Sequence, residues 1–240
     1  MSRAPAIELG PGVYRIPTLP GDIINSFAFV DADDQVTLVD CGLRTASKRI
    51  LAALEWMGTG PSDVTRIILT HAHVDHAGGL SRMRGRTGAP VAVHERDADY
   101  VRTGKIPVND RSTRTGRIFR RVPERGFSPV EVNEELVDGQ VLDVGGGLEV
   151  VHTPGHTPGH MSLVHQESGV LITGDALFNW RGRIKWPPLA FCTDVALTQK
   201  TAARLGDLKY DVVAFTHGPE IRDNAREAVR GFLRGQRVSP

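Results

Sequence analysis

The chain has 240 residues, 40% of them hydrophobic and 24% charged, as expected for a soluble globular protein with one well-buried domain or two small ones. Lys and Arg number 29 against 28 Asp and Glu, so the net charge indicates no particular partner. No apolar run approaches the length of a membrane span, and we expect no membrane partner. The 2 cysteines give no disulfide framework and the first residues lack an apolar signal segment, which predicts a cytoplasmic protein.

Short apolar stretches alternate with segments of helical periodicity along the first half of the chain. Ile50, Leu54 and Met57 lie at helical spacing and predict a helix over 45–57. The apolar stretch 64–69 predicts a buried strand, and the Gly-Gly step behind it opens a second helix at about Gly78. Further strands are predicted at 13–16, 23–30, 35–39 and 90–94.

The second half of the chain is predicted to contain two hairpins and two helices. The turns 145–147 (Gly-Gly-Gly) and 167–169 (Glu-Ser-Gly) separate the paired apolar runs of the hairpins. The predicted hairpins cover 140–152 and 161–173, the predicted helices cover 194–205 and 220–233, and one further strand covers 212–215.

Two short internal similarities predict a duplication. Residues 37–40 resemble 172–175, because each run is an apolar strand that ends in a carboxylate. Residues 67–71 resemble 212–217, because each strand delivers a Thr-His pair. Two matches in the same order favour two similar β-rich halves, so we expect a β-sandwich covered by helices, in a single domain over 1–240.

A basic excursion is expected at about 96–130. Residues 96–125 hold 9 basic and 4 acidic side chains. One interpretation is a solvated helix and loop, and the other is a lid that attracts an anionic substrate.

The most informative run is Thr70-His71-Ala72-His73-Val74-Asp75-His76, directly behind the predicted strand 64–69. Its four metal-ligating side chains are more than core packing calls for, because buried polar groups are costly. The carboxyl end of a strand is also where α/β proteins place chemistry. With imidazole and carboxylate ligands and no thiol, zinc is the leading metal, with iron or manganese as alternatives.

Three further polar residues at strand ends or in a rigid turn can complete this site: His156, Asp175 and His217. The set exceeds what one tetrahedral ion takes, so two ions are predicted. His71, His73 and His156 would hold the first ion, Asp75, His76 and His217 the second, and Asp175 would bridge them. Two ions about 3.5–4 Å apart can share a hydroxide and polarise the group it attacks.

These residues, preceded by Asp40, resemble in order the signature motifs of the metallo-β-lactamase-fold hydrolases, and the resemblance spans nearly the whole chain. In motif the chain is most similar to glyoxalase II-like thioesterases and to quorum-quenching lactonases. The resemblance implies an α/β fold, a four-layer αββα sandwich with a metal site at one edge. It also implies that Asp40 orients a ligand, and we place His160 in a similar supporting role. Asp75, between the two ion sites, is predicted to orient the hydroxide or pass on its proton.

Several branches of this family differ from the chain at particular residues. The oxygen-reducing diiron branch carries a carboxylate where this chain has His73, which disfavours a redox role. True β-lactamases carry Cys or Ser in place of Asp175, which disfavours antibiotic hydrolysis as the main activity. The lactonases commonly carry a Tyr three residues past the bridging Asp, where this chain has Phe178 and so lacks a hydroxyl.

The stretch 178–188 concentrates two of the three tryptophans beside three basic residues. It is either an ordinary packed loop or one wall of a substrate pocket, with aromatic faces for an apolar moiety and cations for a carboxylate or phosphate. In the second interpretation the pocket residues are Phe178, Trp180, Arg183 and Trp186.

The sequence therefore predicts a dinuclear metal-dependent hydrolase that attacks an ester, lactone or thioester with a metal-bridging hydroxide. The substrate is expected to be a small molecule, anionic if the basic residues bind it, and a nucleic acid partner is disfavoured. One alternative is a phosphodiesterase or nuclease that uses the same ions. Another is a metal-stabilised binding or regulatory protein without turnover. The residues leave the physiological substrate and the oligomeric state open.

Overall fold

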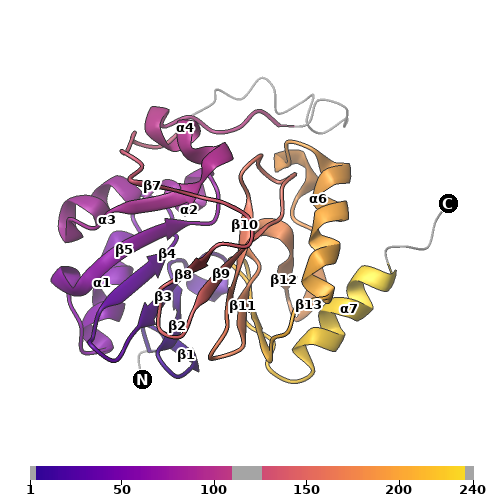
Figure 1. Ribbon diagram of the computed structural model, residues 1–240, viewed down its shortest axis with the longest axis horizontal. Coiled ribbons are helices and arrows are strands. Elements are labelled where there is room, and N and C mark those ends of the chain that lie inside the picture. The colour runs from indigo at the N-terminus through magenta and orange to yellow at the C-terminus, as the bar shows by residue number, and fades with distance from the viewer. Residues whose placement is uncertain (1–3, 110–125, 236–240) are drawn as a thin grey trace.

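The computed structural model describes residues 4–109 and 126–235, which form two large β-sheets and one two-stranded sheet, with helices outside the large sheets (Figure 1). The first sheet has the strand order β1-β2-β3-β4-β5-β6-β7. Its strands are β1 (Ile7–Gly10), β2 (Val13–Pro17), β3 (Asn25–Val30), β4 (Val36–Val39), β5 (Val64–Leu69), β6 (Val91–His94) and β7 (Glu134–Leu136). The second sheet has the order β14-β11-β10-β9-β8. Its strands are β8 (Val141–Leu142), β9 (Leu148–His152), β10 (Met161–His165), β11 (Val170–Ile172) and β14 (Val212–Ala214).

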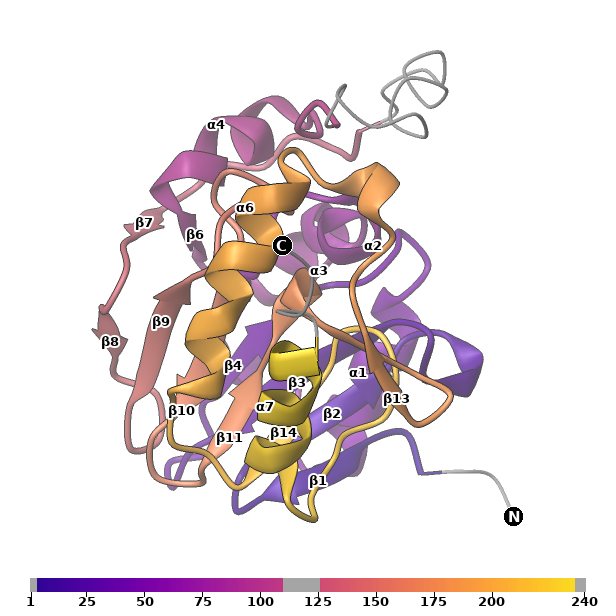
Figure 2. The ribbon, with the colours of Figure 1, turned by 90° about the vertical axis from the view of Figure 1, so that its right-hand side faces the viewer.

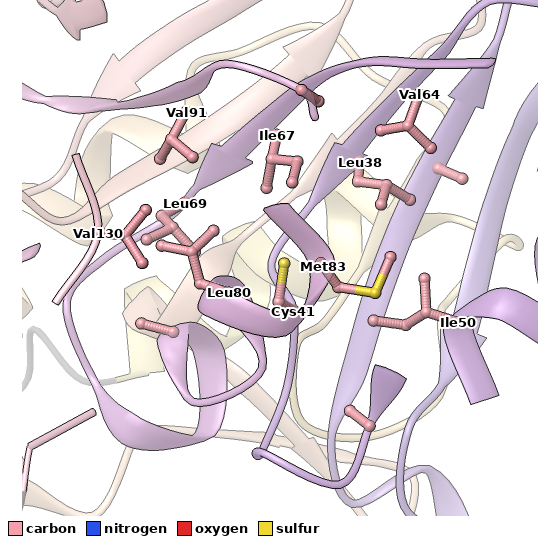
Figure 3. Close-up of a cluster of buried hydrophobic side chains, with 14 of the residues drawn as sticks. Leu38, Cys41, Ile50, Val64, Ile67, Leu69, Leu80, Met83, Val91 and Val130 are labelled. Atoms are coloured by element: carbon pink, nitrogen blue, oxygen red, sulfur yellow. The ribbon is translucent and has the colours of Figure 1, made fainter. Parts of the chain in front are cut away.

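The outer face of the first sheet is covered by α1 (Ser47–Trp56), α3 (Leu80–Thr87) and α4 (Glu95–Thr103). Alternation along β5 decides which side chains meet these helices, because successive residues of a strand point to opposite faces. Ile67 and Leu69 pack against Ile50, Leu80 and their neighbours (Figure 3), whereas Ile68 faces the second sheet. The core is thus divided into an outer layer and an inter-sheet layer.

The second sheet is covered on its outer face by α6 (Val195–Ala202), the short helix η5 (Ala203–Gly206) and α7 (Ala225–Gly235), as Figure 2 shows. Leu171 and Val213 of the sheet pack there against Leu205 and Val229. Helix, sheet, sheet and helix therefore form four layers, and the α/β sandwich predicted from the sequence is confirmed.

The two sheets repeat one strand pattern, as the internal similarities predicted. In the first sheet β3 is antiparallel to β4, and β4 is parallel to β5. In the second, β10 is antiparallel to β11, and β11 is parallel to β14. The strands that end in Asp40 and Asp175 are thus equivalent, and so are those that end in Thr-His. This equivalence brings both pairs of strand ends to one edge of the sandwich.

Some elements differ from the sequence expectations. The first part of the basic excursion is the ordered helix α4, while the proposed lid falls largely on 110–125, outside the described residues. The stretch 178–188 contains a hairpin of β12 (Phe178–Trp180) and β13 (Arg183–Lys185). The last helix begins at Ala225 and not at Glu220, because Ile221 pairs with Val213 and Asn224 takes a left-handed φ of 54°. Among the described residues, no helix is both long and apolar enough to span a membrane.

Candidate metal centre

The seven sequence-predicted ligands meet at the edge of the sandwich where β5, β11 and β14 end. His71 and His73 leave β5, and the one-turn helix α2 (Val74–Ala77) carries Asp75 and His76. Among the described residues, three groups of side chains lie close enough to hold an ion, with the ligand atoms of each group within 4.8 Å of one another. These groups are His71, His73 and His156; His71, His76 and Asp175; and Asp75, His76 and His217.

The first predicted trio converges through ring nitrogens. His71 Nε2 lies 3.1 Å from His73 Nδ1. The rings of His71 and His156 stand 4.8 Å apart at 82°, and those of His73 and His156 stand 4.6 Å apart at 79°. All three side chains are buried. Edge-on rings around one point are an arrangement in which three imidazoles can share a cation.

The second trio surrounds the Asp75 carboxylate, which is partly open to solvent. Asp75 Oδ1 lies 3.8 Å from His76 Nε2, and Asp75 Oδ2 lies 3.4 Å from His217 Nε2. Two imidazoles and one carboxylate are a ligand set suited to zinc and to other divalent transition metals.

Asp175 lies between the trios, and its two oxygens face different ones. Oδ2 lies 3.1 Å from His156 Nε2 and 3.9 Å from His71 Nε2. Oδ1 lies 3.3 Å from His76 Nε2 and 3.4 Å from His217 Nε2. The carboxylate is thus placed as a bridge between two ligand sets.

Asp40 orients ligands of both trios. His76 Nδ1–H donates to Asp40 Oδ2 over 2.8 Å, which leaves His76 Nε2 to face the centre. The Thr70 hydroxyl donates to the same oxygen over 2.8 Å, and His71 Nδ1–H donates to that hydroxyl over 3.1 Å. Such outer partners fix the tautomer and the ring orientation of metal-ligating histidines. The sequence placed Asp40 in this role but missed Thr70.

His160 is buried beside the bridge and does not join the ligand groups of the described residues. Its Nε2 accepts a hydrogen bond of 2.7 Å from the Asp175 N–H, and its Nδ1 lies 3.0 Å from the Thr153 carbonyl oxygen. The Thr216 hydroxyl donates to Asp175 Oδ1 over 2.7 Å. A side chain at Gly174 would lie 2.6 Å from His160 Nε2, so the approach of His160 to the bridge requires glycine there. His160 therefore positions Asp175.

Two more partners of the ligands were missed in the sequence. His217 Nδ1–H donates to the Ile23 carbonyl over 2.6 Å, a contact across 194 positions that no local pattern could reveal. Cys192 places Sγ 3.5 Å from His156 Nδ1. Cys41 is buried in the outer core of the first sheet (Figure 3).

Burial and neighbouring charges set the protonation of the ligands. Burial and the nearby His156 lower the pKa of His73 to about 3, and burial together with His76 holds the pKa of His71 well below its usual range. Burial opposes charge on His156 and His217 as well, but the Asp175 carboxylate outweighs it and raises the pKa of each to about 9. The Asp175 carboxylate therefore favours the protonated form of both rings.

The buried nitrogens provide a test of whether a metal fits. Nε2 of His76, His156 and His217 is buried without a hydrogen-bond partner among the described residues, although each lies 3.1–3.4 Å from an Asp175 oxygen. A buried donor or acceptor without a partner costs about 1–3 kcal/mol. A cation coordinated by these atoms would remove that cost, so the residues fit a metal centre.

The β12–β13 hairpin lies beside this centre. Phe178 stacks on His217, with ring centroids 4.2 Å apart at 28°. Lys185 and Arg183 are the cross-strand partners of Phe178 and Trp180, which places all four side chains on one face. Trp186 is not brought to that face, because its ring packs against Phe232 in the core behind the hairpin.

Comparison with known proteins agrees with this fold. The sequence model of the metallo-beta-lactamase superfamily matches residues 19–217, and the chain belongs to that superfamily of metal-binding hydrolases. The uncharacterized protein YobT of Bacillus subtilis is 31% identical over 240 residues, covering 93% of this chain and 97% of YobT. An N-acyl homoserine lactonase of Bacillus thuringiensis is 29% identical over 187 residues, covering 76% of this chain and 67% of the lactonase. The crystal structure of a metallo-beta-lactamase family protein from Thermus thermophilus is 28% identical, with a TM-score of 0.74 and coverage of 96% of this chain and 81% of that one.

Proposed function

We propose that the protein is a dinuclear hydrolase of carbonyl substrates, with two zinc ions held by the two trios and bridged by Asp175. The observation that carries this proposal is the division of the Asp175 oxygens, one toward each trio. A single structural ion would need only one closed set of four ligands, whereas seven are present. When bound, such a pair of ions supplies an activated water and a Lewis acid for the carbonyl oxygen.

The residues of the chain have separate parts in this reaction. Asp175 holds the two ligand sets together and, with Asp40 and His160, keeps their geometry fixed. Burial opposes the charge of Asp75, but His76 and His217 hold the pKa of Asp75 well below its usual range, so it is a carboxylate. An ionised Asp75, partly open to solvent, accepts a hydrogen bond from the attacking water and orients it.

The substrate class follows from the hairpin face. Phe178 and Trp180 offer apolar surface beside His217, and Arg183 and Lys185 lie exposed on the same face. Among the described residues, the ion pairs of Arg and Lys side chains with carboxylates include neither Arg183 nor Lys185. We therefore propose a small acyl substrate that also carries a carboxylate or phosphate. Phe178 has no hydroxyl to hold a lactone carbonyl or leaving oxygen, which favours thioesters and open-chain esters over lactones.

Metal analysis combined with a substrate panel tests the proposal. The purified full chain should contain two zinc ions, and His217→Ala should contain one. The panel comprises anionic and neutral thioesters, esters, lactones and a bis-aryl phosphate. Turnover of acyl substrates, abolished by chelation and restored by Zn²⁺, is the expected result. One ion per wild-type chain would refute the dinuclear centre, preference for the phosphodiester would indicate a nuclease-like enzyme, and no turnover with two ions bound would indicate a binding protein.

A further inference from the structure

Asp97 is a fully buried carboxylate that is not part of the metal centre. It lies in the first turn of α4, near the start of the basic excursion, and none of its side chain is exposed. Its pKa is raised, because burial opposes the charge more than its hydrogen bonds favour it. A buried carboxylate is costly unless its oxygens are fully occupied, so its partners indicate why the fold tolerates it.

The partners of Asp97 come from the two loops that carry the first trio. Asp97 Oδ2 accepts from the N–H of Ala72 over 2.9 Å, and Ala72 stands between His71 and His73. The same oxygen accepts from the hydroxyl of Thr157 over 2.7 Å, and Thr157 follows His156. Asp97 Oδ1 accepts from the N–H of Gly159 over 2.6 Å. One carboxylate therefore holds both loops.

The contact at Gly159 is tight. A Cβ at this position would lie 2.5 Å from the Asp97 backbone nitrogen and 2.8 Å from its carboxyl carbon, so only glycine lets the loop reach α4. The two loops are otherwise joined at their base, where the Met161 N–H donates to the Thr70 carbonyl over 3.0 Å. Asp97 adds a second connection between the loops, on the side of the ligands. With one connection the loops can still rotate relative to each other, whereas two connections fix the distance between them.

We propose that Asp97 is a positioning residue that sets the spacing of the loops 71–73 and 156–160, so that His71, His73 and His156 converge on one ion. This inference rests on the proposed metal pair. Asp40 contrasts with it, since Asp40 contacts the second-trio ligand His76 directly. Asp97 instead supports the loops that carry the ligands of the first ion, and neither Asp40 nor Asp97 is itself a ligand of that ion.

Three donors meet two oxygens at Asp97, which makes Asp97→Asn a sharp test. An Asn side chain has nearly the same shape but only one acceptor oxygen, so its NH₂ group must oppose either the Gly159 N–H or the Ala72 N–H. The spacing of the loops is then released while the buried volume is kept. Asp99→Asn is the matched control, because Asp99 is on the same helix and its side chain is 94% exposed.

The experiment measures Zn²⁺ affinity by competition with a chromophoric chelator, on full chains in the His217→Ala background. Only the first trio is complete there, so the measured dissociation constant belongs to that site. Asp97→Asn should weaken it about 10- to 100-fold, the usual effect of losing an outer-shell partner. Asp99→Asn should leave it unchanged. In the wild-type background, Asp97→Asn should alter the second dissociation constant by less than about threefold.

A second pair of variants keeps the inference falsifiable if Asp97→Asn fails to fold. Thr157→Val removes one donor to Asp97 and keeps the side-chain volume, and Thr157→Ser keeps the donor. Thr157→Val should weaken Zn²⁺ binding at the first site, and Thr157→Ser should leave it unchanged. Equal losses of Zn²⁺ affinity at both sites, or an unchanged affinity at the first site, would overturn this inference but not the proposed function. A wild-type chain that binds no Zn²⁺ would overturn the proposed function and this inference with it.

Discussion

The ring of His76 is held at 2.8 Å by the carboxylate of Asp40, a residue 36 positions earlier in the chain. Both side chains are fully buried, and Asp40 itself takes a left-handed φ of 60°. Asn tolerates that conformation as well as Asp does, so replacing Asp40 by Asn removes the charge without straining the backbone. The centre can therefore be perturbed through this one contact.

Asp40→Asn should weaken binding of the second ion about 10- to 100-fold, because His76 loses the partner that fixes its tautomer. The first ion should be affected less, since His71 reaches Asp40 only through Thr70. Metal content after dialysis against a graded series of chelator concentrations measures this. Asp34→Asn is the control, because Asp34 is exposed and has a φ of 59°. Retention of both ions by Asp40→Asn would contradict the assigned role.

Phe178→Tyr should raise kcat/KM for lactones about 2- to 10-fold relative to thioesters, because the new hydroxyl can donate one hydrogen bond beside His217. The ratio of the two substrates in the same preparation is the measurement, so differences in metal loading cancel. Phe232→Tyr, behind the hairpin, should leave the ratio unchanged. A ratio that stays constant in Phe178→Tyr would show that the ring does not face the substrate.

The double variant Arg183→Gln and Lys185→Gln should raise KM for an anionic thioester about 3- to 10-fold, with kcat nearly unchanged. A neutral thioester of similar size should show no change. Because the two cations are exposed, the effect should diminish as salt is added. Lys200→Gln combined with Lys209→Gln removes the same charge elsewhere on the surface and serves as the control. Equal changes for both substrates would refute an anion-binding face.

The environment of His94, a residue outside the metal-ligand groups, predicts that the stability of the fold depends on pH. It stacks on His152 with ring centroids 3.9 Å apart, and burial and that neighbour lower its pKa to about 4. The folded pKa lies below the unfolded value of about 6.5, so the unfolded chain binds the proton more tightly. Stability should therefore fall as the pH drops from about 6.5 toward 4.

Between pH 7.0 and 5.0 the part of this loss due to His94 should be about 1–2 kcal/mol, less than the full shift implies because pH 5.0 lies above the folded pKa of about 4. Chemical denaturation at pH 7.0 and 5.0 measures the change, and His94→Gln should show a smaller one. If His94→Gln and the wild type lose the same stability, the dependence arises elsewhere.

The sequence alone determined which residues could form the centre and which fold would carry them. The density of ligands in 71–76 is a local signal, and so is the alternation of Ile67, Ile68 and Leu69 that buries β5 on both faces. The repeated strand endings at Asp40 and Asp175 were also visible, because each is a short pattern of neighbouring residues. Patterns of this kind depend only on local chain geometry, and the fold that they predicted is confirmed.

Tertiary structure alone decided how the ligands are held. The carbonyl of Ile23 on His217, the thiol of Cys192 at His156 and the carboxylate of Asp97 between two loops join positions far apart in the chain. In the sequence, Asp97 is one of four acidic residues in a basic segment for which one interpretation is a solvated helix and loop. Only the packing of α4 against the loops shows that Asp97 is buried. Such hydrogen bonds depend on distances between separate elements, which arise when the layers pack and which no local pattern encodes.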